Sequence, residues 1–140
     1  MKEKTPERFV LDAFAILAYL EGEPAAQRVG DVLTSGDPWM TLINLGEVTY
    51  IVERTRGKAA ADDVYANLLA QDRPGGGVAI RWLPIDQALV RRAASLKAGG
   101  GLSYADCFAA AAAAMLGCSV LTGDPEFRAV ERAGIGVTWL

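Results

Sequence analysis

The sequence contains no histidine. This absence excludes the nucleophile–histidine pairs of serine and cysteine hydrolases, histidine-based acid–base pairs and histidine-ligated zinc. The two cysteines, Cys107 and Cys118, are too few for a thiolate cage. Both lie in an apolar, alanine-rich stretch, so we expect reduced core residues of a cytoplasmic protein and no disulfide. Carboxylates remain as the main candidates for acid–base or metal chemistry.

Long apolar runs and an excess of positive charge are also missing. The longest apolar stretch, residues 107–116, is too short to span a bilayer. The apolar run near the N-terminus is interrupted by Asp12 and ends at Glu21, which argues against a signal peptide. We therefore expect no membrane segment. The net charge of −3 excludes nucleic-acid binding through bulk charge alone, although a local basic patch remains compatible with it.

With 140 residues, 51% of them hydrophobic, the chain suits one domain over residues 1–140. Short apolar runs alternate with helical patterns, which favours an α/β fold with a mostly parallel sheet covered on both faces. Ligands of such sheets bind beyond the carboxyl ends of the strands. The glycine triplets at 75–77 and 99–101 follow no strand into a dinucleotide-binding turn and are interpreted as loops. Expected strands cover residues 9–11, 39–42, 78–83, 119–121 and 137–139, and expected helices 13–20, 24–35, 44–56, 58–71, 86–98, 103–116 and 125–133.

Four acidic residues occupy similar places near predicted helix starts. Asp12 ends the first predicted strand, and Asp124 stands between a buried strand and Pro125. Glu47 and Asp106 lie in the first turns of two predicted helices. Because the carboxyl ends of parallel strands meet at one edge of a sheet, these positions predict that the four carboxylates lie close together.

Helix capping is the alternative explanation for each of these acids. Asn44 and Ser103 precede Glu47 and Asp106 by three residues, the spacing of a capping box. Asp124 before Pro125 is typical of a helix start, and Asp12 is also placed to cap a helix. The capping and metal-binding interpretations can both hold for the same residue.

Four carboxylates in one cleft would repel one another. The N-termini of four helices, at about +0.5 charge each, offset only about half of that charge. The remainder raises pKa values or attracts a cation, and an all-oxygen site suits Mg²⁺ or Mn²⁺. Such an ion lowers the pKa of a bound water and neutralises charge on a phosphodiester, so this pattern indicates phosphoryl chemistry without histidine.

The segments VLDAFAILAYL, INLGEV, LSYADCFAAAAA and LTGDPEF resemble, in order and spacing, the successive motifs of PIN-domain nucleases. The small size resembles the VapC-type ribonuclease toxins of toxin–antitoxin pairs. This resemblance implies a three-layer α/β/α sandwich and an endoribonuclease that depends on Mg²⁺ or Mn²⁺. It also implies a homodimer, an RNA substrate and a cognate antitoxin that covers the active-site groove. The implied catalytic metal ligands are Asp12, Glu47, Asp106 and Asp124, and the implied supporting polar residues are Asn44, Ser103 and Thr122.

The chain departs from the family pattern two residues after the first aspartate. The family often has serine or threonine there, and this chain has Phe14. The departure leaves open a catalytically impaired PIN-like module that binds RNA or protein. It also weighs against a phosphatase with an aspartyl nucleophile at Asp12, which usually carries a second aspartate at that position.

Two cationic clusters and several aromatic residues bear on substrate binding. We expect Arg54, Arg56 and Lys58 to include contacts with RNA phosphates, whereas a solvated helix surface is the alternative for both clusters. The second cluster is Arg91, Arg92 and Lys97. We expect core or dimer contacts, and no base stacking, for Tyr19, Trp39, Tyr50, Tyr65 and Trp82. The helix over 13–20 is expected to bury Phe14, Leu17 and Ala18.

Overall fold

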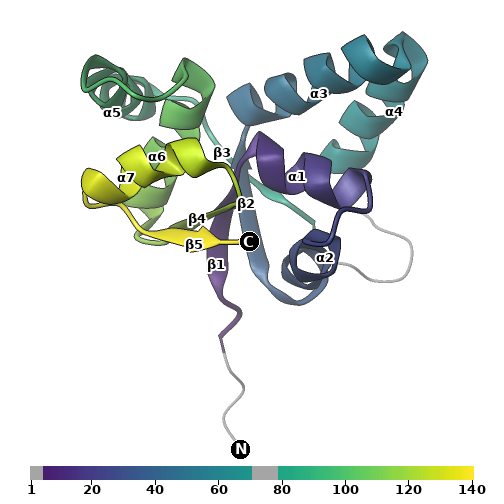
Figure 1. The fold of residues 1–140 in the computed structure, drawn as a ribbon, viewed down its shortest axis with the longest axis horizontal. Helices are drawn as coiled ribbons and strands as arrows, with labels where there is room; N and C mark the ends of the chain where they lie inside the picture. The colour runs from purple at the N-terminus through teal and green to yellow at the C-terminus, as the bar shows by residue number, and fades with distance from the viewer. Residues whose placement is uncertain (1–4, 71–78) are drawn as a thin grey trace, which may run out of the picture.

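Five parallel strands form the central sheet of the protein, which a computed structural model describes over residues 5–70 and 79–140 (Figure 1). Along the sheet the strands lie in the order β3-β2-β1-β4-β5. Their bounds are β1 Arg8–Leu11, β2 Asp37–Thr41, β3 Arg81–Leu83, β4 Ser119–Thr122 and β5 Val137–Trp139. The chain runs from β1 outward to β3 and then returns to β4 on the other side of β1, so the strand order reverses between β1 and β4. In parallel sheets a ligand crevice forms at this switch point.

Helices cover both faces of the sheet (Figure 1). One layer holds α1 (Ala13–Leu20), α2 (Ala26–Ser35), α3 (Leu42–Arg56) and α4 (Lys58–Leu69). The other holds α5 (Gln87–Ala98), α6 (Tyr104–Leu116), the 3₁₀ turn η1 (Pro125–Phe127) and α7 (Arg128–Arg132). The expected three-layer α/β/α sandwich is therefore confirmed.

The sheet separates two hydrophobic cores because side chains alternate along each strand. Phe9 and Leu11 of β1 pack with residues of α1–α4, whereas Val10 packs with residues of α5–α7. In the second core α6 lies flat on the sheet through a run of buried alanines, residues 109–113. Small side chains let this helix approach closely, which brings its N-terminal turn to the carboxyl edge of the strands.

Several element boundaries differ from the sequence predictions. The strand expected at 78–83 begins at Arg81, and residues 71–78, with the glycine triplet at 75–77, lie outside the described residues. Helix α3 begins at Leu42 because the Thr41 hydroxyl accepts a hydrogen bond from the backbone N–H of Asn44 at 3.2 Å. The expectation that Asn44 caps this helix is therefore wrong. Both cysteines are free thiols, as expected.

The prediction that Phe14 is buried is also wrong. The residue is 40% exposed. The buried residues of α1 are Ala13, Ala15, Ile16 and Ala18, so the expectation is confirmed for Ala18 alone. Of the aromatic residues expected in the core or a dimer contact, Trp39 and Trp82 are half-buried against the two cores. The exposed ones are Tyr19, Tyr50 and Tyr65. In the part of the chain that the structure describes, no helix combines the length and apolarity needed to cross a membrane.

Candidate metal centre

Asp12 lies where β1 ends, at the switch point of the sheet. Its Oδ1 accepts the backbone N–H of Ala15 at 2.9 Å and so caps α1, and its Oδ2 accepts the hydroxyl of Thr122 at 2.5 Å. Only 1% of the residue is exposed. Burial raises the pKa of Asp12 to about 7, against the lowering effect of these two hydrogen bonds, and the charges of Asp106 and Asp124 add to the rise. Capping and crowding therefore occur together at this carboxylate.

Asp106 projects from the first turn of α6 toward the same edge. Ser103 caps this helix, and its hydroxyl accepts the backbone N–H of Asp106 at 3.2 Å. Burial raises the pKa of Asp106 to about 6, and the negative charge of Glu47 is the next largest cause. Asp12 and Asp106 are 94 positions apart in the sequence, yet they lie close enough for the charge of Asp106 to raise the pKa of Asp12.

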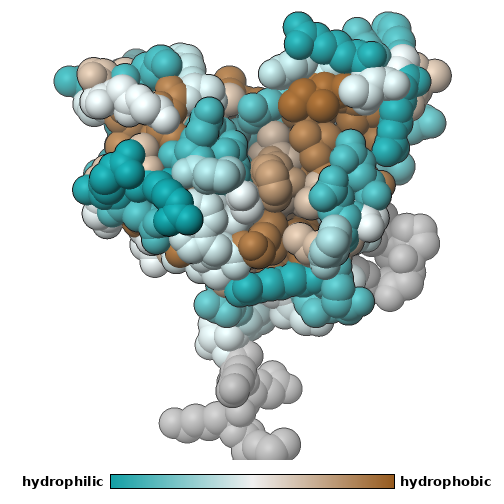
Figure 2. All heavy atoms as spheres, in the orientation of Figure 1, coloured by the Kyte–Doolittle hydropathy of each residue, from teal (hydrophilic) through white to brown (hydrophobic). Residues whose placement is uncertain are grey.

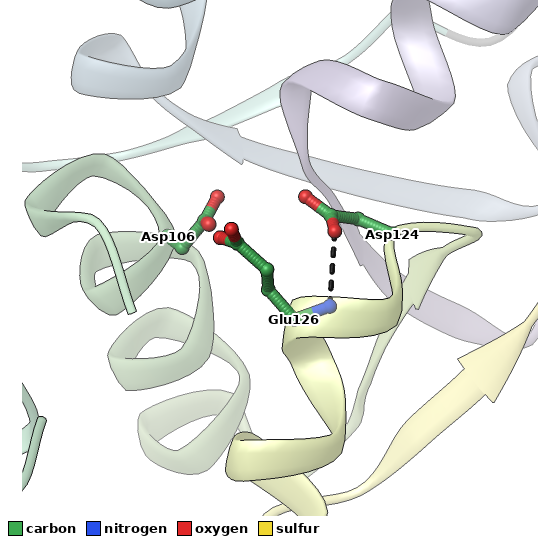
Figure 3. Close-up of side chains that lie close together, drawn as sticks. All are labelled: Asp106, Asp124 and Glu126. Atoms are coloured by element: carbon green, nitrogen blue, oxygen red, sulfur yellow. Dashed lines mark hydrogen bonds between the residues drawn. The ribbon is translucent and has the colours of Figure 1, made fainter. Parts of the chain in front are cut away.

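Asp124 and Glu126 complete the acidic cluster from the turn after β4 (Figure 3). Asp124 caps η1 by accepting the backbone N–H of Glu126 at 3.0 Å. One carboxylate oxygen from each of Asp106, Asp124 and Glu126 lies within 4.8 Å of the others, so these three could share a metal ion. The Thr122 hydroxyl accepts the backbone N–H of Asp124 at 3.0 Å while it donates to Asp12, and so joins the two acids of neighbouring strands.

The sequence reasoning missed Glu126. The motif LTGDPEF contains it, but helix-start chemistry singled out only Asp124. The available signal was an acid two residues beyond the predicted cap, and the short 3₁₀ turn that begins at Pro125 places its side chain opposite Asp106 (Figure 3).

Glu47 approaches the cluster from α3. Its Oε1 is buried and has no hydrogen-bond partner among the described residues. Burial raises its pKa, the Asn44 side chain opposes this rise, and the charge of Asp124 adds to it. A buried carboxylate oxygen without a partner is costly unless it meets a proton or a cation.

Asn44 connects α3 to α6. Its amide nitrogen donates to the carbonyl of Ala105 at 3.0 Å, and its Oδ1 accepts the Thr41 hydroxyl at 2.6 Å. Ala105 immediately precedes Asp106. These bonds fix the start of α3 against the start of α6 and so set the position of Glu47 relative to Asp106.

The donor set fits a hard divalent cation. All candidate ligands are carboxylate oxygens, and Asp12, Glu47 and Asp106 have raised pKa values. In residues 5–70 and 79–140, the ion pairs between side chains involve none of the five clustered acids. Mg²⁺ and Mn²⁺ prefer oxygen ligands, and either would supply the charge that the protein does not.

The three cations expected to contact RNA do not join the carboxylates. Arg54 and Arg56 lie in the last turn of α3, so Arg54 is about 10 Å along the helix from Glu47. The Arg54 guanidinium stacks over the Tyr50 ring at 5.1 Å, and Lys58 pairs with Asp62 at 2.9 Å. This group therefore lies at the far end of α3 from the acidic cluster.

Comparison with known proteins points to one family and one fold. The profile of the PIN domain family matches residues 9–133. No curated protein matches the chain by sequence.

Solved structures give the same fold. A DNA-bound VapBC complex of Salmonella typhimurium is 19% identical, with a TM-score of 0.69 over 94% of this chain and 97% of that chain. A Mycobacterium tuberculosis toxin that cleaves the sarcin–ricin loop is 17% identical, with a TM-score of 0.64 over 94% and 98%. VapBC2 of Rickettsia felis, bound to promoter DNA, is 12% identical, with a TM-score of 0.68 over 94% and 97%.

Proposed function

The chain belongs to the PIN domain family, and from this premise we propose that it is a divalent-metal-dependent endoribonuclease. We further propose that it is the toxin of a toxin–antitoxin pair. The proposal rests on one observation. Five acids converge at the switch point of the sheet, and no side-chain ion pair within residues 5–70 and 79–140 compensates them: Asp12, Glu47, Asp106, Asp124 and Glu126.

The proposed chemistry divides between the ion and the protein. Bound Mg²⁺ or Mn²⁺ supplies an activated water and neutralises charge that develops on the phosphodiester. Asp12, Asp106 and Glu47 would hold the ion, with Asp124 and Glu126 completing its surroundings from the η1 turn. Thr122 orients Asp12 through its 2.5 Å hydrogen bond, and Asn44 positions Glu47 through its bond to Ala105. Ser103 fixes the helix turn that carries Asp106.

The test is cleavage of single-stranded and hairpin RNA by the purified protein. We expect internal cuts in the presence of Mg²⁺ or Mn²⁺ and none in EDTA. Gel analysis of end-labelled RNA distinguishes internal cuts from removal of terminal nucleotides. Cleavage that persists in EDTA, or intact RNA with both metals, would contradict the proposal.

The cationic cluster at the end of α3 and the start of α4 extends the proposal to RNA binding. Changing Arg54, Arg56 and Lys58 to glutamine is expected to weaken RNA binding, because a protein that makes fewer phosphate contacts releases fewer counterions from the RNA. The slope of log K against log salt should flatten by about 1 to 2, given about 0.7 per phosphate contact of single-stranded RNA. Fluorescence anisotropy at several salt concentrations measures this slope.

The matched control changes three cations elsewhere. Glutamine at Arg91, Arg92 and Arg132 removes the same charge from α5 and α7 and should leave the slope near the wild-type value. Equal slopes for the two triple variants would assign the α3 cluster to an ordinary solvated surface.

The similar structures include VapBC complexes, which supports a protein partner for this chain. We propose that a cognate antitoxin covers the apolar strip of Leu42, Ile43 and Tyr50 on α3, whose side chains are 46%, 37% and 48% exposed. Figure 2 shows hydrophobic residues gathered over α1 and α3 beside a hollow in this face. A homodimer and a cytoplasmic location remain predictions.

A catalytically impaired binding module is the second candidate function. Phe14 favours it, because no hydroxyl stands at that position to orient a ligand or water. RNA that is bound and never cut, with either metal, would support this candidate over the nuclease.

A further inference from the structure

Phe14 lies two residues after Asp12 on α1, and its ring packs against Gly123. A Cβ atom at Gly123 would lie 2.5 Å from Cε1 of Phe14, so the ring rests against a stretch of backbone that only glycine leaves open. Gly123 stands between Thr122 and Asp124, the residues that hold Asp12 and join the acidic cluster. The ring is nevertheless 40% exposed. An aromatic face is therefore available next to the carboxylates.

Phe14 lines a pocket of about 450 Å³. Its apolar lining includes Phe14, Ala18, Pro24 and Gly123, and its charged lining is Glu23 and Arg28. Arg28 donates from Nη1 to the carbonyl of Trp139 at 3.2 Å, which fixes the guanidinium and leaves other N–H groups for a ligand. A pocket of this size, apolar with a few charged groups, suits a small planar molecule or part of one.

We propose that this pocket binds one nucleobase of the RNA strand, stacked on Phe14, beside the phosphate to be cleaved. This inference rests on the proposed nuclease function. The carboxylate cluster repels the RNA backbone, and Arg54, Arg56 and Lys58 lie at the far end of α3 and the start of α4. A contact that does not depend on net charge would therefore add affinity near the cut. Stacking on an aromatic ring is such a contact. Arg28 and Glu23 add a donor and an acceptor for the base edge or the neighbouring phosphate.

Phe14, which stands where the family often has serine or threonine, is the stacking platform in this proposal. A hydroxyl at position 14 would be too small to form the wall of the pocket, whereas a phenylalanine covers Gly123 and presents its face. In this proposal Phe14, which lacks the hydroxyl of the family pattern, holds a base by stacking.

The experiment compares RNA with and without bases. Single-stranded oligoribonucleotides of about eight residues, and abasic ribose-phosphate strands of the same length, are titrated by fluorescence anisotropy. The protein carries Asp106→Asn, which removes the expected cleavage and leaves Phe14 in place. We expect base-bearing RNA to bind roughly tenfold more tightly than abasic RNA, and Phe14→Ala to remove this preference.

Three further variants separate stacking from packing. Phe14→Trp should keep the preference, and Phe14→Leu, which still covers Gly123, should lose it. Tyr19→Ala is the matched control, because Tyr19 lies on the same helix, is also 40% exposed and does not line the pocket. A preference that survives in Phe14→Ala, or that Tyr19→Ala removes equally, would overturn the proposal.

Parallel measurements separate this inference from the proposed function. If wild-type protein cuts RNA and Phe14→Ala leaves the base preference intact, the nucleobase pocket is wrong and the nuclease stands. If wild-type protein cuts no RNA but the preference depends on Phe14, the pocket stands and the nuclease is wrong. A variant that weakens only the binding of a protein inhibitor would assign the pocket to a peptide and overturn the inference.

Discussion

Replacing Asp106 with asparagine is expected to reduce metal-dependent RNA cleavage by at least about a hundredfold. Loss of a metal ligand removes both affinity for the ion and the placement of its water, and even changes to residues that only support ligands typically cost 10- to 100-fold. Initial rates of cleavage of a labelled RNA, at several Mg²⁺ concentrations, measure the effect. Glu126→Gln should reduce the rate of metal-dependent cleavage less than Asp106→Asn does, because Glu126 reaches the cluster from an exposed position.

Folding should not account for this loss. Asp106 is crowded by the charges of Glu47, Asp124 and Glu126, so a neutral side chain of the same shape relieves repulsion. We expect the melting temperature of Asp106→Asn in EDTA to equal or exceed the wild-type value. Glu131→Gln, which neutralises an exposed acid of α7 outside the cluster, should keep wild-type activity. Wild-type rates in Asp106→Asn would remove the candidate metal centre.

In the absence of metal, the protein is expected to lose stability as the pH rises from about 4 to about 7. Asp12 and Asp106 have folded-state pKa values of about 7 and about 6, above the ordinary value of 3.8. Between these values the folded state binds more protons than the unfolded state, so the free energy of unfolding falls with rising pH. The stabilising contribution is complete below about pH 4 and is lost as the pH passes the folded pKa. For the buried Asp12 it is on the order of a few kcal/mol.

Divalent metal should reverse this dependence at high pH. Mg²⁺ or Mn²⁺ binds the ionised carboxylates of the folded state, so it should raise the melting temperature more at pH 8 than at pH 5. Differential scanning fluorimetry with EDTA, Mg²⁺ or Mn²⁺ across this pH range measures both effects. Asp12→Asn should flatten the pH dependence in EDTA. A melting temperature that rises from pH 5 to pH 8 in EDTA would contradict the crowded, uncompensated cluster.

The recurrence of acids at helix starts predicted much of the cluster, because two physical rules coincide there. Carboxylates cap helices, and in a parallel sheet those helix starts follow the carboxyl ends of the strands. Asp12 and Asp124 cap α1 and η1, and Asp106 lies in the first turn of α6. The three acids also lie together in one cluster. Glu47 also lies near them. Its helix begins at Leu42, two residues earlier than predicted, so Glu47 is in the second turn and not, as expected, in the first. Thr41 and Asn44 can both cap a helix. The structure has Thr41 as the cap, in extended backbone at the end of β2.

The sequence alone determined the parallel α/β architecture and excluded histidine chemistry. Hydrophobic periodicity and residue composition belong to the chain itself and do not depend on tertiary contacts. It could not place Phe14, whose helical spacing matched a buried face. In the tertiary structure the residue is 40% exposed, and its ring packs against Gly123, which is distant in the chain. The same holds for Glu126 and for the pairing of Thr122 with Asp12: both depend on where the η1 turn and β4 stand relative to α6 and β1. Contacts between remote segments follow from three-dimensional packing, which no local pattern specifies.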